Sequence, residues 1–501
     1  MTHFKTFLTT ASTVALLGGS SAFADVTAQQ VWEDWKENLA IYGQEGFTFG
    51  DENLLGGTLT VSDVAINFSD DLTDVTADFG DIIFVEQGDG TVQVTMANAI
   101  PMSIKPKDAN GGAEMLITNS GLLIVAGGSP DAMTYDVQAN QYGFRVDELT
   151  DESGAPIEGD LYFTANNFSG QYTTKPGDIR TIDYAVDIEY VDLLVDLTQP
   201  NGTETIVMSG KINNISGVAA VAMPDGIDMS KPDTMFVDGF AASGNYSLGE
   251  SNYIFDLDAD GSKVAWSASM GSGAVSADIN AAGLDYNTLA RDLAINVQSG
   301  DLPFPVDVSL SEYGIGMKMP FMKTEEPTDF GFSINLTDLA VNEEIWMMAD
   351  PSGALSHDPA TLKLDLGGKA KLFFDLMDPE QADAMAMGGA PGELHALTLN
   401  ELQLKIAGAL LTGTGGFTFD NTKPSMVPGM PQPEGEITVN LKGANQLIDS
   451  LVAMGLLPED QAMMGRMMMG MFARTVGDDE LSSTIEINDQ GHILANGQRI
   501  Q

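Results

Sequence analysis

Apolar side chains occupy every second position over most of this 501-residue chain, and this alternation constrains the fold more than any other feature. In residues 182–190, Ile182, Tyr184 and Val186 alternate with Asp183 and Ala185, and the same rule holds at 330–336 and 362–366. A period of two is typical of strands that have one apolar and one polar face. The alternation predicts strand after strand from about Leu59 to Asp420.

Short turn signals separate these runs, among them Asn110-Gly111-Gly112, Asn201-Gly202 and Asp260-Gly261. Such dipeptides favour tight hairpins. We therefore expect a mainly β fold, an elongated and curled antiparallel sheet with an N-terminal helix and C-terminal helices. Residues 25–501 show no clear internal boundary and are predicted to form a single β-rich domain.

One eight-residue pattern recurs at 59–66, 334–341 and 397–404, with apolar residues at its first, third, sixth and eighth positions. An acid stands at the fifth position in each copy: Asp63, Asp338 and Glu401. The alternation slips by one residue at that acid. A β-bulge there would keep all four apolar side chains on one face of the sheet.

The first 24 residues have the pattern of a cleavable secretory signal. Lys5 precedes a short apolar stretch at 7–18, and Ala22-Phe23-Ala24 provides small residues before Asp25. We expect cleavage after Ala24 and export to the periplasm as a soluble protein. No later segment has the roughly 20 apolar residues that a spanning helix needs.

A helix near 28–42 is expected to open the mature chain. Thr27 and Gln30 form a capping-box signature, and Trp32, Trp35, Leu39 and Tyr42 recur at helical spacing. We interpret this stripe as the face that docks on the sheet.

A second helical segment is expected near 444–472, and it is rich in methionine. Met464 and Met468 are separated by four residues and so share a helix face, where two thioethers offer a weak Cu(I) site. The alternative is that the methionines fill the core or contact an apolar ligand, as flexible side chains often do.

A weak calcium site is the other metal candidate. Asp256, Asp258 and Asp260 precede Gly261 with the spacing that opens a calcium loop, but Ser267 stands where the closing acid belongs. The same residues suit an ordinary hairpin turn between two strands.

Composition narrows the possible functions. The chain has no cysteine and a formal net charge of −50, which disfavours nucleic acid and anionic lipid surfaces as partners. No metalloprotease helix, nucleophile elbow or phosphate loop occurs. We therefore predict no enzymatic activity, no catalytic residue and no cofactor, apart from weakly bound Ca²⁺ at the candidate loop.

Several segments resemble an uncharacterised family of exported alphaproteobacterial proteins, the domain of unknown function 2125. They include 25–32, 399–402, 407–413, 417–420, 451–460 and the closing segments 483–488 and 491–498. The resemblance covers the mature chain and implies no catalytic residue. More loosely, the long sheets resemble those of AsmA-type envelope proteins, whose curled sheets are thought to shelter lipid tails.

Two functional hypotheses follow. If the helices cannot cover the whole apolar face of the sheet, the remainder is expected to bind a lipid or another apolar ligand in the periplasm. If the sheet buries its own apolar face, a scaffold that binds another envelope protein is the alternative.

Overall fold

The fold is that of a computed structural model, which describes residues 25–41, 46–69, 72–200, 202–225, 227, 237–259, 261–376, 391–424 and 431–500. The predicted signal segment, and Tyr42 of the predicted helix, lie outside the described residues. The described residues contain no helix that is long and apolar enough to cross a membrane.

Strands dominate the described residues, and all of them join one antiparallel sheet. The prediction of a mainly β, curled antiparallel sheet is confirmed. The strands of the N-terminal third are β1 (Phe47–Thr48), β2 (Glu52–Leu55), β3 (Thr58–Ser69), β4 (Thr73–Glu86), β5 (Val92–Thr95), β6 (Ala99–Pro106), β7 (Gly112–Ser120), β8 (Leu123–Ser129) and β9 (Ala132–Thr150).

The long central strands pair mostly with their neighbours in sequence, as hairpins dictate. They are β10 (Pro156–Lys175), β11 (Ile179–Thr198), β12 (Thr205–Pro224), β13 (Ala241–Leu248), β14 (Ser251–Ala259), β15 (Ser262–Met270), β16 (Ser272–Asn280), β17 (Gly283–Ser299), β18 (Val306–Pro320) and β19 (Thr328–Val341). The last strands are β20 (Ala360–Leu372), β21 (Gly392–Ile406), β22 (Ala409–Pro424), β23 (Pro431–Lys442), β24 (Arg474–Gly477), β25 (Glu480–Ile487), β26 (Ile493–Ala495) and β27 (Gln498–Arg499).

The described residues form four helices beside the sheet: α1 (Ala28–Ile41), α2 (Glu343–Ala349), α4 (Ala444–Ala453) and α5 (Glu459–Phe472). The capping box predicted for α1 is present, because the Thr27 backbone N–H donates to Gln30 Oε1 at 3.0 Å and the Gln30 N–H donates to Thr27 Oγ1 at 3.3 Å. Both predicted helical regions are thereby confirmed, the second as two helices that Pro458 separates.

A line of irregular residues crosses the central strands, and we call it the crease. Its markers are Asn167, Asn214, Asp292 and Asp338, whose φ angles of +49°, +50°, +53° and +57° are left-handed. The pairing of β10 with β11 omits Asn167 and Glu189, and the pairing of β11 with β12 omits Glu189 and Asn214. The irregularity therefore continues from strand to strand at one level of the sheet.

Irregularities of this kind explain the slip in the apolar pattern. The bulges predicted at Asp63 and Asp338 are confirmed, because both residues have positive φ and the strand registers shift beside them. At the third copy the register shifts beside Glu401, where Asp365 pairs with Glu401 but Leu366 pairs with Leu399. A bulge moves the alternation by one place, so the same face of the sheet stays apolar on both sides.

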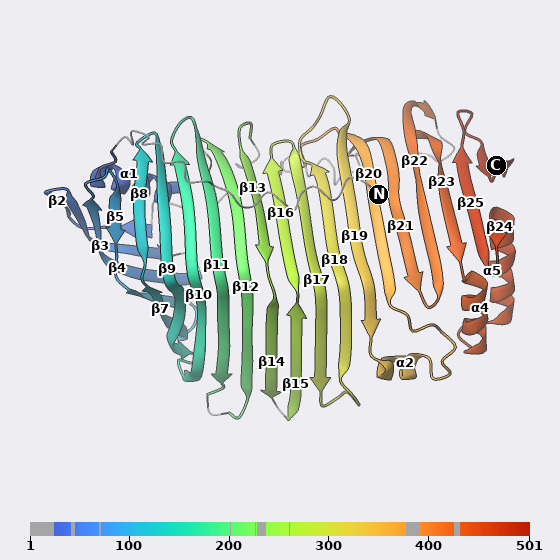
Figure 1. Ribbon diagram of the computed structural model, residues 1–501, viewed down its shortest axis with the longest axis horizontal. Coiled ribbons are helices and arrows are strands. Elements are labelled where there is room, and N and C mark those ends of the chain that lie inside the picture. Colours follow the sequence, from blue (N-terminus) through green and yellow to red (C-terminus); the bar gives the residue numbers. More distant parts are fainter. Residues whose placement is uncertain are drawn as a thin grey trace.

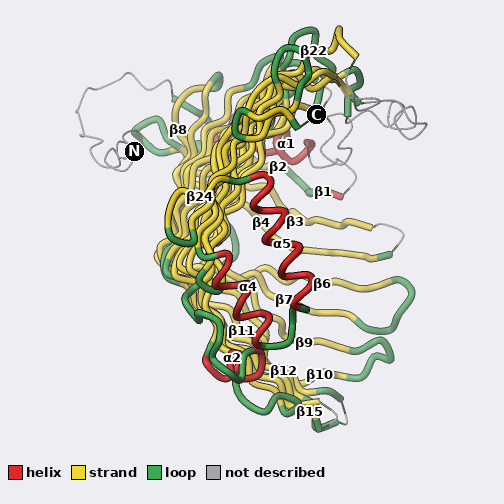
Figure 2. The backbone as a smooth tube through the Cα atoms, turned by 90° about the vertical axis from the view of Figure 1, so that its right-hand side faces the viewer, coloured by secondary structure: helices red, strands yellow, loops and turns green. Residues whose placement is uncertain are grey.

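The sheet is elongated across its strands (Figure 1), with α1 at the N-terminal end and α4 and α5 at the C-terminal end. Seen end-on, the sheet is curved, and α1 lies on the inner side of the curve (Figure 2). In that view the strands labelled β3, β4, β6, β7, β9 and β10 run towards the right, away from the stack that the other strands form. This change of direction brings β3 and β4 round to face α1.

Candidate functional site

One face of the sheet, which we call the apolar face, is hydrophobic from strand to strand. Residues that pair directly across antiparallel strands share a face. One such row runs from β9 to β26 without a charged or amide side chain: Tyr135, Tyr172, Tyr184, Ala219, Gly244, Ala277, Tyr286, Met317, Phe332, Leu366, Leu399, Gly415, Ile437, Ile485 and Ala495.

A second row on the far side of the crease is equally apolar: Phe144, Phe163, Leu193, Gly210, Tyr253, Ala268, Ile295, Val308 and Val341. The neighbouring row on the opposite face instead contains Asp183, Ser243, Asp278, Asp285 and Lys318. We call that side the polar face. The contrast between adjacent rows shows that the sheet is amphipathic over its length.

Many described side chains of the apolar face are exposed. Tyr246, Ile295 and Phe332 have 43%, 44% and 42% of their surfaces exposed. The exposed large side chains of this face also include Tyr142, Phe163, Tyr184, Val275, Met319 and Leu339. A monomeric protein rarely exposes a contiguous apolar patch of more than a few hundred Å², so such a face points to a ligand or partner.

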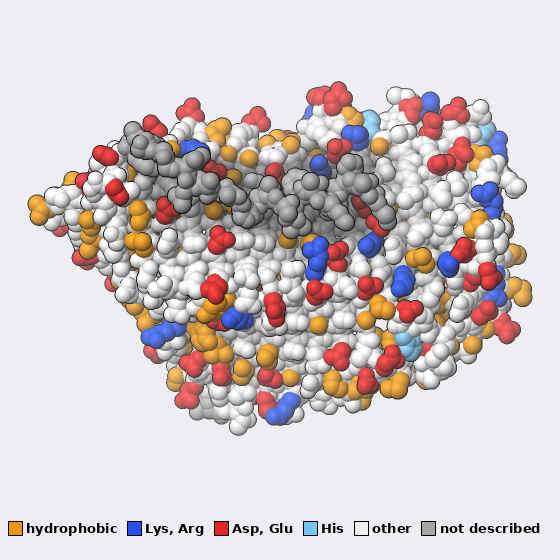
Figure 3. Space-filling view, in the orientation of Figure 1, with side chains coloured by type: hydrophobic (Ala, Val, Ile, Leu, Met, Phe, Trp, Pro, Cys, Tyr) orange, Lys and Arg blue, Asp and Glu red, His pale blue; other side chains and the backbone are white. Residues whose placement is uncertain are grey.

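The viewer of Figure 1 faces the polar side, because α1 lies behind the strands. In the matching space-filling view (Figure 3), acidic and basic side chains are spread over the central strands. A hollow of about 750 Å³ on this side is lined by residues such as Asn245, Asp278 and Asn287. Its polar groups bond one another, since Asn287 donates to Asp285 at 2.9 Å and Lys369 pairs with Asp329 at 2.8 Å. This face has the character of a solvated surface.

Helix α1 covers the N-terminal end of the apolar face. Its Val31 and Trp32 are fully buried against a cluster that includes Leu59, Val61 and Phe84. The Trp32 ring lies 5.7 Å from that of Phe84, and its Nε1 donates to Glu52 Oε1 at 2.7 Å. This hydrogen bond lowers the pKa of Glu52. The predicted docking role of the tryptophan stripe is confirmed for Trp32.

A buried carboxylate, Asp34, joins α1 to the strands beneath it. The Tyr135 hydroxyl on β9 donates to Asp34 Oδ2 at 2.6 Å, and the Thr174 hydroxyl on β10 donates to Oδ1 at 3.0 Å. Burial and the Asp34 charge raise the pKa of Tyr135, so this phenol keeps its proton. Arg180 on β11 contributes a cation 3.9 Å from Asp34 and donates to Asn38 Oδ1 at 2.7 Å.

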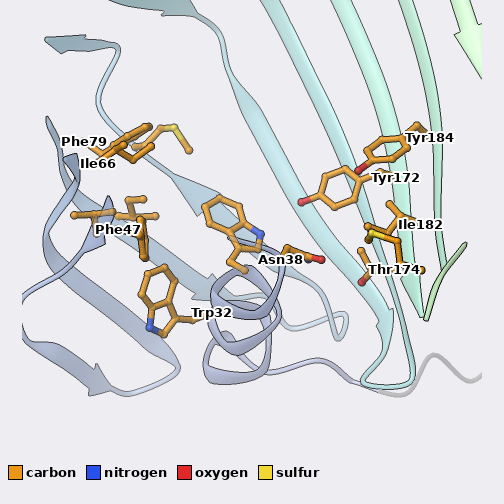
Figure 4. A pocket seen from close by; sticks show the side chains of 14 residues that line it. Trp32, Asn38, Phe47, Ile66, Phe79, Tyr172, Thr174, Ile182 and Tyr184 are labelled. Atoms are coloured by element: carbon orange, nitrogen blue, oxygen red, sulfur yellow. The ribbon is translucent and has the colours of Figure 1, made fainter. Parts of the chain in front are cut away.

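An apolar cavity of about 280 Å³ lies at the edge of the area of the sheet that α1 covers. Figure 4 shows Phe47, Ile66 and Phe79 on one side, with Tyr172 and Tyr184 on the other. The remaining lining residues are Trp32, Trp35, Asn38, Val64, Ile82, Met96, Thr174, Ile182 and Met223. Tyr172, Tyr184 and Ile182 also belong to the apolar face, so the cavity continues directly onto that face.

The sequence did not reveal this cavity. The alternation identified Ile182 and Tyr184 as apolar-face residues, but nothing local indicated that β3 and β4 would stand opposite them. The stripe that contains Trp35 gave a partial signal, and we interpreted it as docking alone. Trp35 in fact both contacts Phe84, at a ring distance of 5.4 Å, and lines the cavity.

The two weak metal candidates lie far apart in the fold. Asp256 and Asp258 are on β14, where Asp258 pairs with Lys263 of β15 and its Oδ2 lies 2.6 Å from the lysine Nζ. Asp260 lies outside the described residues. Among the residues that the structure describes, no three His, Cys, Asp or Glu side chains are grouped to hold a metal. Calcium binding stays a prediction.

The methionines of α5 are not in the core, which corrects one interpretation made from the sequence. Met464 and Met468 are 58% and 53% exposed, and Met463, Met467 and Met471 are more so. Ala462 is the one buried residue of α5, and among its methionines only Met469 is partly buried. Cu(I) binding by Met464 and Met468 likewise stays a prediction.

Comparison with known proteins identifies a family for this chain but no individual relative. Searches of the curated proteins and of the solved structures find no match to this chain. A family model described as an uncharacterised protein conserved in bacteria, DUF2125, matches residues 195–493, from the end of β11 to the start of β26. The match includes most of the apolar face. The chain belongs to this uncharacterised bacterial family, the domain of unknown function 2125.

Proposed function

We propose that this protein binds the apolar chain of a lipid or a similar amphiphile on its apolar face, in the periplasm, after removal of residues 1–24. One observation carries the proposal: two rows of paired apolar residues extend along the sheet while Tyr246, Ile295 and Phe332 stay more than 40% exposed. At about 25 cal/mol per Å², covering such a face is strongly favourable.

The cavity beside α1 supports the same function. Ligand pockets are mostly apolar, with a few polar groups that orient the ligand. This one is lined largely by aromatic and aliphatic side chains, with Asn38 and Thr174 as its polar members. The end of an acyl chain would fit there, and the remainder of the chain would continue onto the exposed part of the face.

The two rows of the apolar face are suited to binding a ligand and not to catalysing a reaction. Its two rows contain no carboxylate, imidazole or amine that could transfer a proton or attack a substrate. A carrier or a binding protein needs no such group. The signal pattern at 1–24 supports a periplasmic location.

Native mass spectrometry of the protein from its own envelope tests the proposal. We expect a chain that begins at Asp25 and carries a bound amphiphile. Val275→Asp, which places a charge on the apolar face, should remove most of the bound mass, because burying an unpaired carboxylate is costly.

The matched control is Ser276→Asp, which adds the same charge one residue away on the polar face. It should retain the ligand. A wild-type protein that carries no amphiphile, or two variants that lose it equally, would refute the proposal.

A separate observation supports a second candidate function, the binding of another envelope protein. Helix α5 exposes five methionines, and flexible methionine surfaces are common where proteins bind varied partners. An interaction role in the envelope would show as a protein crosslinked to α5 in intact cells. Replacing Met463 and Met467 with Glu should then abolish the crosslink without loss of bound lipid.

A further inference from the structure

The ends of the strands on one side of the sheet carry almost only negative charge, and we call this edge the acidic rim. It comprises the turns after β9, β11, β14 and β17, the two strand residues on either side of each turn, and the segment between β19 and β20, along the lower edge of Figure 1. Its acids among the described residues are Asp151, Glu152, Glu204, Asp258, Asp301, Asp307, Glu343, Glu344, Asp350 and Asp358.

Only one lysine or arginine belongs to the described part of this rim. It is Lys263, whose Nζ lies 2.6 Å from Asp258 Oδ2 and is therefore already neutralised. The opposite edge carries charges of both signs, because Lys175 and Lys323 lie there among acids such as Asp178 and Glu325. The two edges of the apolar face thus differ in the charge that they present.

The acidic rim is close to the apolar face. In three hairpins the last apolar pair lies next to it: Leu197 with Ile206, Leu257 with Val264, and Val297 with Val306. Asp258 directly follows Leu257, and Asp301 lies within the turn between Val297 and Val306. An amphiphile whose chain lies on this face would place its head group at the rim.

We propose that the protein selects amphiphiles whose head carries an accessible ammonium group, and that the head lies against the acidic rim. This inference rests on the proposed function. The ammonium would be attracted by Glu152, Asp301 and Glu344, while a head with net negative charge would be repelled. At physiological salt the Debye length is about 8 Å, so charges at the rim act on the head more strongly than charges on the polar face.

The test uses the mature chain and vesicles that contain equal amounts of phosphatidylethanolamine and phosphatidylglycerol with identical acyl chains. The composition of the bound lipid is measured by mass spectrometry after the protein is separated from the vesicles. We expect the ethanolamine lipid to be enriched about two- to fivefold, the size expected of exposed charge pairs, and the enrichment to shrink in high salt.

Two triple variants locate the source of the preference. Glu152→Lys, Asp301→Lys and Glu344→Lys together reverse three rim charges and should abolish or invert the enrichment. Asp187→Lys, Asp256→Lys and Asp285→Lys reverse three exposed charges on the polar face and should leave it largely intact. Circular dichroism of both variants shows whether the sheet is retained.

The outcomes separate the two proposals. Wild-type protein that binds both lipids in the ratio of the vesicles would overturn the rim selectivity while leaving the proposed function in place. Equal effects of the two triple variants would also overturn it, because the preference would then reflect net charge alone. Protein that takes up neither lipid would refute the proposed function itself.

Discussion

The position of α1 depends strongly on single residues that join it to the sheet. Asp34 accepts hydrogen bonds from Tyr135 and Thr174, which belong to two adjacent strands, and Arg180 of the next strand lies close by. These polar contacts fix the angle at which the helix crosses the apolar face. They therefore also fix one wall of the cavity.

Asp34→Ala should loosen this helix. The change removes the acceptor of two buried hydroxyls, and we expect a loss of about 2 kcal/mol in the free energy of unfolding. Urea denaturation followed by the fluorescence of Trp32 and Trp35 would measure it. Glu33→Ala is the control, because Glu33 is exposed and pairs with Lys36 at the surface, and it should cost less than about 0.5 kcal/mol. Equal losses would contradict the role of Asp34.

Asp350 gives a pH dependence at the segment that follows α2. The backbone N–H of Leu355 donates to this buried carboxylate at 2.6 Å, and together with the Ser352 hydroxyl it lowers the Asp350 pKa from 3.8 to about 2. A lowered pKa in the folded state means that ionised Asp350 stabilises the fold above about pH 4. This stabilisation is lost as the pH falls from about 4 to about 2.

Asp350→Asn should therefore lower the melting temperature at pH 7, and the difference from wild type should narrow as the pH falls below 4. Differential scanning fluorimetry at pH 7, 4 and 2.5 measures this trend. A difference that stays constant over this range would show that the carboxylate charge does not stabilise the segment.

At the scale of single elements, the crease keeps the long strands apolar on one side. Residues in the left-handed region cost about 1–2 kcal/mol unless they are Gly, Asn or Asp, and the crease markers are all Asn or Asp. β-Branched residues tolerate this conformation least. The identity of these residues therefore matters for the backbone even where the side chain is exposed.

Asp292 is the cleanest position at which to test the crease, since its side chain is exposed and its φ is +53°. Asp292→Val should destabilise the protein by about 1–2 kcal/mol, whereas Asp292→Gly should change stability by less than about 0.5 kcal/mol. Chemical denaturation measures both. Asp285→Val, in a regular part of the same strand, is the control and should be neutral or slightly stabilising.

Much of this level of structure could be predicted from the sequence. The slip at Asp63 and Asp338 predicted the bulges, and the alternation at Ile182 and Tyr184 identified the apolar face. Local pattern could not show that β13 and β14 both pair with β12, on either side of the crease. Nor could it show that α5 exposes its methionines, because burial depends on which distant surface meets the helix.

At the scale of the whole molecule, the sheet has more apolar face than the described helices cover. Helix α1 covers the N-terminal end, and the exposed apolar-face residues named above lie between β9 and β19. The cavity was beyond sequence reasoning for a related reason: its walls come from β3 and β4 on one side and from β10 to β12 on the other. Only the turn of the whole sheet brings these walls together.

Photo-crosslinking from paired positions on the two faces tests the account most directly. A benzophenone amino acid is placed at Phe332, on the apolar face, or at the adjacent Ser333, on the polar face, and cells are irradiated before the protein is purified. We predict adducts with the mass of a lipid at Phe332 and none at Ser333. Equal labelling at the two positions, or no lipid adduct at Phe332, would contradict the central claim that the apolar face holds an amphiphile.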